Sequence, residues 1–219
     1  YEYPPILALQ ELRGLIDDDE LGGTVTMVHV ANMPSFLGRT VYFSPVDGKN
    51  LNRVYPGQAD GTVSQRIAYA ITHEVIDKAD YVLDLHSGDG NESLRPYVYQ
   101  AITGERKLDS AVARLVLAFG IDHILLDRSR PTDPAQSLYC STTAITRGKP
   151  AMTIESGLLG RRDTESVERI VAGVRGVMRE LKMTAEGPPP VANPVYLDPS
   201  AVIASPATGV LFPLVERDQ

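Results

Sequence analysis

The stretch YVLDLHSGDG places an aspartate and a histidine inside an otherwise apolar run. Asp84 and His86 are two residues apart, so on a β-strand both side chains point to the same face. His86 directly precedes Ser87-Gly88, which puts the imidazole at the carboxyl end of the strand, the edge where open α/β sheets bind ligands. An imidazole there can bind a metal ion while the carboxylate fixes its tautomer. The alternative is a core histidine that is simply hydrogen-bonded to a neighbour.

A second group of polar side chains lies in the loop SPVDGKNLNRVYPG, residues 44–57. Asn50, Asn52 and Arg53 are close together there, just before a predicted helix. The planar guanidinium of Arg53 can donate two parallel hydrogen bonds to a carboxylate, so the loop is a candidate for carboxylate recognition. An ordinary solvated loop would have a similar composition.

A third candidate is Glu155, which ends the apolar run of TIESG at residues 153–157. A glutamate in this position can be no more than the solvated end of a strand. If it shares a cleft with a metal ion, its carboxylate can act as the general base for a water molecule.

Alternating strands and helices are predicted around these side chains. Apolar, β-branched runs predict strands, and apolar residues at helical spacing predict helices. The predicted strands cover residues 24–31, 81–86, 96–100, 122–127 and 151–156; the predicted helices cover residues 4–16, 61–79, 107–119, 137–147 and 163–181. This order predicts an α/β fold, with a mostly parallel or mixed sheet flanked by helices.

The composition changes near the carboxyl end of the sequence. EGPPPVANP has the composition of a linker, and the residues after it form short apolar pieces separated by Pro and Gly. We therefore predict a main domain over residues 1–186 that carries the candidate catalytic residues, a linker over 187–194, and the start of a small C-terminal β domain over 195–219.

The overall composition excludes several classes of protein. Of the 219 residues, 43% are hydrophobic and 22% are charged, as in ordinary soluble proteins. The net charge of −7 and the lack of a Lys/Arg run argue against nucleic-acid binding. One cysteine, Cys140, excludes an intramolecular disulfide, and no apolar run is long enough to span a membrane. With no signal peptide in the given sequence, a cytoplasmic location is expected.

Three motifs in this order, DGKNLNRVYPG, DLHSGDG and TIESG, resemble the succinylglutamate desuccinylase/aspartoacylase family, which is related to the zinc carboxypeptidases. The resemblance extends from residue 1 to about Leu181. It implies a zinc carboxypeptidase-like fold and a zinc-dependent hydrolase, with Zn²⁺ as cofactor. The implied reaction is cleavage of the amide bond of a small N-acylated amino acid, that is, deacylation by a metal-activated water. Ester substrates are also compatible with this chemistry.

The resemblance also implies roles for individual residues. Glu2 and His86 correspond to zinc ligands, with Asp84 supporting His86 from behind, and Glu155 corresponds to the general base. The family's histidine partner of Glu2 would precede Tyr1, so the resemblance implies that the given sequence is a fragment of the domain.

The implied substrate-binding residues are Asn52 and Arg53, which would bind a carboxylate or polarise the scissile carbonyl. Arg53 therefore also counts as catalytic. The family uses a further arginine ahead of this pair, for which Arg39 is the nearest candidate. Three other side chains are candidates to reach the substrate: Arg95, Tyr139 and Arg147.

Two alternatives to a deacylase remain open from the sequence. A zinc carboxypeptidase would use the same metal, base and arginine on a peptide. A non-catalytic relative would keep the fold for binding only, although the joint presence of Arg53, His86 and Glu155 favours an enzyme. In each case the expected partner is a small molecule, and a homo-oligomer is compatible with the sequence.

Overall fold

A five-stranded sheet forms the centre of the molecule in the computed structural model, which describes residues 1–198, 201, 203–210, 212 and 214. The strands lie in the order β1-β4-β2-β3-β5. Their bounds are β1 Val82–His86, β2 Tyr97–Ala101, β3 His123–Asp127, β4 Ala151–Glu155 and β5 Val195–Leu197.

The sheet is mixed. β1 pairs with β4, β2 with β3, and β3 with β5 in parallel, whereas β2 and β4 run antiparallel. Because β2 is reversed, its first residue, Tyr97, lies level with the last residue of β4, Glu155. One edge of the sheet therefore combines the carboxyl ends of β1 and β4 with the amino end of β2, and the predicted α/β fold is confirmed.

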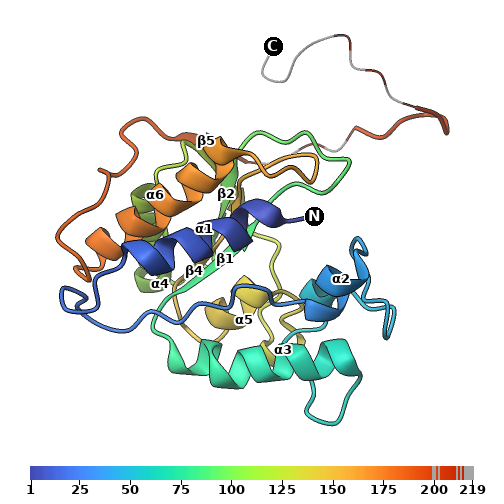
Figure 1. Cartoon of the computed structure of the whole chain (residues 1–219), viewed down its shortest axis with the longest axis horizontal. Helices are drawn as coiled ribbons and strands as arrows, with labels where there is room; N and C mark the ends of the chain where they lie inside the picture. Colours follow the sequence, from blue (N-terminus) through green and yellow to red (C-terminus); the bar gives the residue numbers. More distant parts are fainter. Residues whose placement is uncertain (199–200, 202, 211, 213, 215–219) are drawn as a thin grey trace.

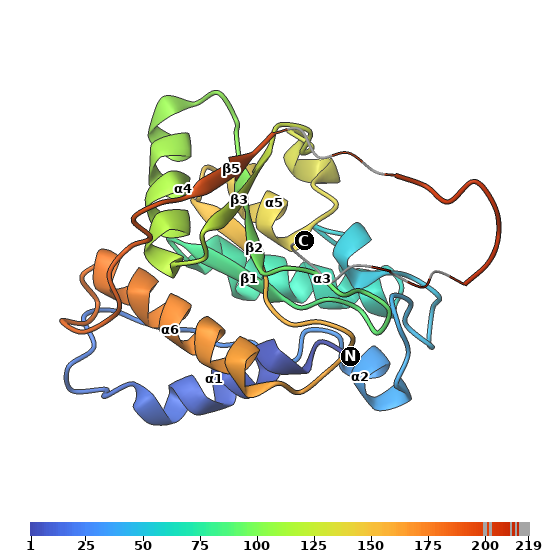
Figure 2. The same cartoon turned by 90° about the horizontal axis from the view of Figure 1, so that it is seen from above.

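Helices cover both faces of the sheet (Figure 1). Figure 2 shows α1 (Tyr3–Leu15), α4 (Arg106–Phe119) and α6 (Thr164–Glu180) on one side of the strands. On the other side lie α3 (Val63–Glu74) and the short α5 (Cys140–Ile145), with α2 (Met33–Gly38) beyond them. Three 3₁₀ turns complete the structure: Leu51–Arg53, Ile76–Lys78 and Pro134–Gln136. No helix in the described part of the chain is both long and apolar enough to cross a membrane.

The helices follow local signals in the sequence. Asp163 begins α6 by accepting a hydrogen bond from Ser166 N at 2.8 Å, and Glu105 caps α4 in the same way. Thr62 and Gln65 form the predicted capping box at the start of α3. The apolar stripes of α4 and α6 then pack against the sheet and against each other.

The core lies between the sheet and the layer that contains α4 and α6. Val98, Ile124 and Ile154 are register neighbours on β2, β3 and β4, and none of the three is accessible to solvent. Their side chains share one face of the sheet because directly paired residues point the same way. The residues that alternate with these along each strand point to the opposite face of the sheet. That face carries the polar side chains described below.

The strand predicted over residues 24–31 is not formed. The segment keeps a two-residue alternation, in which Val25 and Met27 are half-buried while Thr24, Thr26 and Val28 are exposed, but no strand ladder includes it. Periodicity predicts only which side chains are buried, whereas a strand also needs a partner within about 5 Å. β1 is an edge strand of the sheet and pairs with β4; the segment 24–31 lines the same cavity as β1 but has no register pair with it.

Two predicted helices are shorter than expected. The helix predicted over 61–79 ends at Glu74 and continues as a 3₁₀ turn over Ile76–Lys78. The helix predicted over 137–147 is reduced to α5, because Leu138 has a φ of 63°, which no helical residue adopts.

The predicted linker and C-terminal domain stay predictions. Val195–Leu197 forms β5, which extends the main sheet next to β3. The division at residues 187–194 stays a prediction, and several positions of the proposed β domain, 199–200, 202, 211, 213 and 215–219, lie outside the described residues.

Candidate active site

A row of three side chains crosses the sheet at the edge where β1 and β4 end. His86 is the register partner of Glu155, and Glu155 is the partner of Tyr97 on the reversed strand β2. Paired residues point to the same face, so an imidazole, a carboxylate and a phenol lie side by side.

A second row lies two residues deeper on the same face. Asp84 is the partner of Thr153, which is the partner of Tyr99. Thr153 Oγ1 lies 2.7 Å from Ser141 Oγ, and Asp84 Oδ2 accepts a hydrogen bond of 3.3 Å from Ser141 N. α5 therefore covers this row and holds Asp84 from the side opposite to His86.

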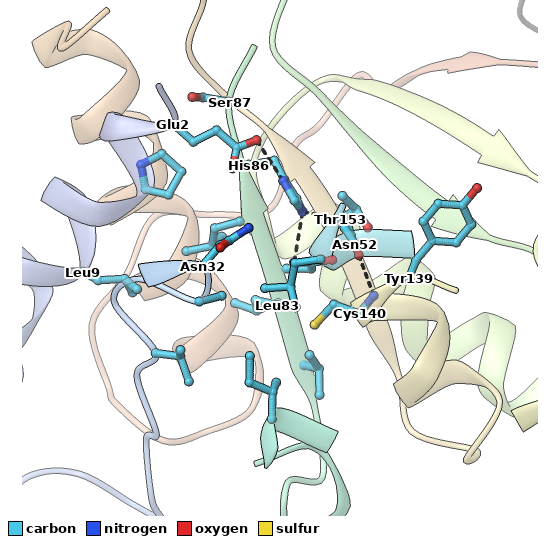
Figure 3. A pocket seen from close by; sticks show the side chains of 18 of the residues that line it. Glu2, Leu9, Asn32, Asn52, Leu83, His86, Ser87, Tyr139, Cys140 and Thr153 are labelled. Atoms are coloured by element: carbon cyan, nitrogen blue, oxygen red, sulfur yellow. Dashed lines mark hydrogen bonds and ion pairs between the residues drawn. The ribbon is translucent and has the colours of Figure 1, made fainter. Parts of the chain in front are cut away.

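His86 is held between two carboxylates. Its Nδ1 lies 3.1 Å from Glu2 Oε1, and its Nε2 lies 3.1 Å from Asp84 Oδ1. Figure 3 shows the Glu2 side chain directed at the imidazole. Asn52 Nδ2 lies 3.4 Å from the same Nε2. The side chain of His86 is 19% exposed, so the imidazole is accessible from the cavity but fixed on both sides.

The two carboxylates make this position favourable for a positive charge. Burial by itself would lower the pKa of His86, but the charges and hydrogen bonds of Asp84 and Glu2 outweigh it and hold this pKa well above its ordinary value. Burial would raise the pKa of Asp84, yet the His86 imidazolium, Ser141 N and the Arg130 guanidinium together lower it.

Glu155 has the opposite environment. Burial, together with the charges of Glu2, Asp84 and Glu92, raises its pKa to about 7, although the charge of His86 opposes the shift. A carboxylate with such a pKa is a stronger base than one in water. Gly157, two residues further along, has a φ of +127°, and a Cβ there would lie 2.7 Å from Ser87 Cβ. The loops after β4 and β1 can approach this closely only because the residue is glycine.

The Asn-Arg pair lies in the 3₁₀ turn Leu51–Arg53. Asn52 is fixed from both sides, since Asn50 Oδ1 accepts from its backbone N at 2.9 Å and its own Oδ1 accepts from Cys140 N at 2.8 Å. Arg53 is exposed, and its guanidinium carbon lies 4.7 Å from the centroid of the Tyr139 ring. The turn therefore presents an amide to His86 and a guanidinium to the solvent side of the site.

A single cavity of about 1860 Å³ brings the predicted residues together. It is lined by all of the side chains that the sequence singled out as ligands, base or substrate-binding groups: Glu2, Arg39, Asn52, Arg53, Asp84, His86 and Glu155. Arg39 reaches it from the loop after α2 and is exposed. Tyr139 also lines the cavity, but Arg95 and Arg147 do not; Arg147 pairs instead with Asp77 at 3.0 Å.

The site residues that the sequence predicted all lie within a region that matches a known protein family. The sequence model of the succinylglutamate desuccinylase/aspartoacylase catalytic domain matches residues 1–181, which include every residue of the site. The chain belongs to the succinylglutamate desuccinylase/aspartoacylase family.

Individual relatives support the assignment. The chain is 30% identical over 216 residues to an N-alpha-acetyl-L-2,4-diaminobutyric acid deacetylase of Halomonas elongata, covering 96% of this chain and 61% of the relative. A solved succinylglutamate desuccinylase from a Silicibacter species is 29% identical with a TM-score of 0.79, covering 90% of this chain and 58% of that one. The product-bound ectoine utilization protein EutE of Ruegeria pomeroyi is 26% identical with a TM-score of 0.77, covering 89% and 58%. The chain thus spans about three-fifths of the length of these relatives.

The donor atoms around His86 fit part of the zinc site that the motif resemblance implies. Two atoms that each lie about 2.0–2.1 Å from a tetrahedral zinc are about 3.3 Å apart. The 3.1 Å between Glu2 Oε1 and His86 Nδ1 is close to this value, and Asp84 supplies the carboxylate that commonly supports a metal-bound histidine. These donors fit two of the three protein ligands of a catalytic zinc. No group of three or more His, Cys, Asp or Glu side chains suited to a metal ion occurs in the part of the chain that the structure describes.

Three residues that line the cavity were not predicted from the sequence: Tyr97, Tyr99 and Arg130. The two tyrosines alternate along β2 and their hydroxyls lie 3.3 Å apart, so the two-residue spacing of PYVYQ was a usable signal. Arg130 lies in the loop after β3, where the sequence DRSRPTD gives no sign that its side chain turns back over the sheet.

Proposed function

We propose that this chain carries the catalytic site of a zinc-dependent deacylase, which hydrolyses the amide bond of a small N-acylated amino acid. The observation that carries the proposal is the position of His86, fixed between Glu2 and Asp84 and level with Glu155 on the next strand. A histidine bracketed by two carboxylates is suited to binding a divalent cation, and a buried carboxylate beside it is suited to moving protons.

Glu2 and His86 would hold the zinc ion, and Asp84 would keep the imidazole in the correct tautomer from its other nitrogen. A bound zinc would lower the pKa of a water molecule and polarise the scissile carbonyl. Asn52, held by Cys140 N, would keep its amide nitrogen next to the imidazole and position the substrate there.

Glu155 would act as the general base. It would take a proton from the attacking water and deliver it to the leaving nitrogen, so that the products are a carboxylic acid and an amine. Arg53, on the solvent side of Asn52, would donate hydrogen bonds to the oxyanion that develops on the carbonyl or to the carboxylate of the amino acid.

The substrate class is inferred from the relatives together with the site. The Halomonas relative is named a deacetylase of an N-acetylated diamino acid, and the solved neighbours are named desuccinylases or aspartoacylases. All three names describe removal of an acyl group from an amino acid.

The proposal is tested by measuring zinc content and amide hydrolysis on the full-length protein and on a His86→Ala variant. His73→Ala is a matched control, because His73 lies on α3 outside the cavity and pairs with Asp77 in the following 3₁₀ turn. We expect about one zinc per chain and release of free amino acid from N-acetyl or N-succinyl amino acids, both lost only in His86→Ala. Zinc-loaded protein that hydrolyses short peptides from their carboxyl end but no N-acyl amino acid would overturn the deacylase assignment.

A further inference from the structure

Two tyrosines of β2 form one wall of the cavity, and no role has been assigned to them so far. Tyr97 is the register partner of Glu155, and Tyr99, two residues along the strand, is the partner of Thr153. Both tyrosine side chains line the cavity and are half-buried. Tyr97 therefore lies on the far side of Glu155 from His86, one strand spacing of about 4.8 Å beyond the proposed base.

The two rings are fixed before any ligand binds. Their centroids lie 5.2 Å apart at an interplanar angle of 78°, which is an edge-to-face arrangement. The guanidinium carbon of Arg130 lies 5.1 Å from the centroid of Tyr99 and packs on that ring. Because a tyrosine side chain has few rotatable bonds, a hydrogen bond to its hydroxyl costs little conformational entropy.

The two hydroxyls leave one proton for a ligand. Tyr97 Oη and Tyr99 Oη lie 3.3 Å apart, and each phenol has one O–H donor, so the bond between them uses only one of the two protons. Neither hydroxyl forms another hydrogen bond with the described residues, so the second proton is available to an acceptor in the cavity. Burial and the charge of Glu155 raise the pKa of Tyr97, so this phenol keeps its proton and stays a donor.

The charges nearby favour a neutral acceptor. The carboxylates of Glu155 and Glu92 both act on Tyr97, and both residues line the cavity. Arg130 donates from its Nε to Asp127, which lines the same cavity, so this pair adds little net charge. An anionic group at Tyr97 would be repelled by the two carboxylates, whereas a neutral oxygen would not.

The charged half of an N-acyl amino acid has a better place elsewhere in the site. Arg53 is exposed on the solvent side of Asn52, where a carboxylate keeps part of its hydration. The acyl half carries no obligatory charge, so it loses least by lying against half-buried tyrosines. This orientation places the acyl group across Glu155, with its end at the two hydroxyls.

We propose that the hydroxyl pair of Tyr97 and Tyr99 forms the acyl subsite, and that it selects a small neutral acyl group with an acceptor oxygen, such as a hydroxyacyl group, over an anionic one. The inference rests on the proposed function and deepens it, since it names the acyl group that the site removes. A site that offers a hydrogen bond discriminates against an analogue without the matching atom, because its own polar group is then left unpaired.

The test uses three N-alpha-acyl derivatives of L-2,4-diaminobutyric acid, the amino acid in the name of the Halomonas relative. The glycolyl and propionyl groups have nearly the same size, but only glycolyl ends in a hydroxyl, whereas succinyl ends in a carboxylate. The value of kcat/KM is measured for each compound on the zinc-loaded full-length protein. The Kd values of the neutral pair are measured by calorimetry in a Glu155→Gln background, where turnover does not interfere.

We expect the parent protein to prefer glycolyl over propionyl by about 3- to 10-fold in kcat/KM and in Kd, as for one hydrogen bond between neutral groups. It should hydrolyse the succinyl compound more slowly than either. The double variant Tyr97→Phe, Tyr99→Phe keeps both rings and should reduce the preference to within about twofold by weakening glycolyl alone. Tyr69→Phe is the control, because Tyr69 is an exposed tyrosine of α3 outside the cavity, and it should change neither value.

Three results would overturn the inference: equal values for glycolyl and propionyl in the parent, a preference that survives in the double variant, or faster hydrolysis of the succinyl than of the glycolyl compound. A different result would refute the proposed function and leave the acyl subsite intact. This is a glycolyl preference in Kd that depends on the two hydroxyls, in a protein that hydrolyses none of the three compounds.

Discussion

His86 Nδ1 and Glu2 Oε1 lie 3.1 Å apart, although 84 positions separate the two residues in the sequence. Glu2 precedes the first turn of α1, and His86 is the last residue of β1. α1 packs along α6, whose position is fixed by the core against the sheet, and this packing brings the start of α1 to the end of β1 (Figure 1). The contact is therefore a consequence of the whole helical layer, and it joins the two donors that the proposed zinc site needs.

Replacing Asp84 by Asn should weaken zinc binding by about 10- to 100-fold, because the amide no longer places a negative charge next to Nε2 of His86. Competition with a chromophoric chelator measures the affinity. Asp122→Asn is the matched control, since Asp122 lies 2.8 Å from His123 Nδ1 in a similar pair outside the cavity. Unchanged zinc affinity in Asp84→Asn would remove Asp84 from the metal site.

Replacing Glu155 by Gln should lower kcat by about 10²- to 10⁴-fold, the usual contribution of a general base, while zinc content stays the same. The amide keeps the shape of the side chain but cannot accept a proton from water. Glu168→Gln on the exposed face of α6 provides the control. Steady-state kinetics together with metal analysis separate loss of the base from loss of the metal; a variant that retains parental kcat contradicts the assigned role.

Asp47 should make the stability of the loop that carries Asn52 dependent on pH. Its carboxylate accepts from Ser64 N at 2.7 Å and Ser64 Oγ at 2.8 Å, at the first turn of α3. Burial alone would raise the pKa of Asp47, but hydrogen bonding by Ser64, the Thr62 side chain and Lys49 N outweighs it and holds the pKa well below its ordinary value. The folded protein therefore prefers the charged form. The resulting stabilisation is present above the unfolded pKa of about 3.9 and is lost as the pH falls toward the folded pKa.

Urea unfolding across this pH range tests the expectation. At pH 7, Asp47→Asn should lower the free energy of unfolding by about 1–2 kcal/mol, as for loss of a helix cap, and the difference from the parent should shrink below pH about 4. Asp60→Asn, at an exposed position nearby, should be neutral at both ends of the range. A difference that stays constant from pH 7 to pH 3 would show that the charge of Asp47 is not involved.

Gly57 should be far less tolerant of a side chain than Gly48 in the same loop region. Both have positive φ, +87° and +66°, but a Cβ at Gly57 would lie 2.1 Å from Tyr69 N, whereas at Gly48 nothing lies within 4 Å. We expect Gly48→Ala to cost about 1–2 kcal/mol for the left-handed backbone. Gly57→Ala should cost more than about 3 kcal/mol, because the backbone of α3 must move. Equal costs in urea unfolding would mean that the turn is not packed on α3 as described.

The strands and helices that carry the site were predictable because their signals are local. Asp84 and His86 share a face because residues two apart on a strand point the same way. The capping box of Thr62 and Gln65 is complete within four residues. The motifs around Arg53, His86 and Glu155 were likewise sufficient for the family. The prediction of a strand over residues 24–31 was wrong for the opposite reason. The alternation of buried and exposed side chains is local, but a strand also requires a hydrogen-bonding partner, which no local pattern specifies.

The sequence by itself determined the fold class and the family, and it named the side chains that we propose for cation binding and proton transfer. Only the tertiary structure decided which of them meet. The reversal of β2 brought Tyr97 level with Glu155, and the turn after β3 carried Arg130 back over Tyr99 and Tyr139. Such contacts depend on strand order and on the path of loops. These are fixed by the packing of residues far apart in the sequence, and the spacing within a motif carries no information about them.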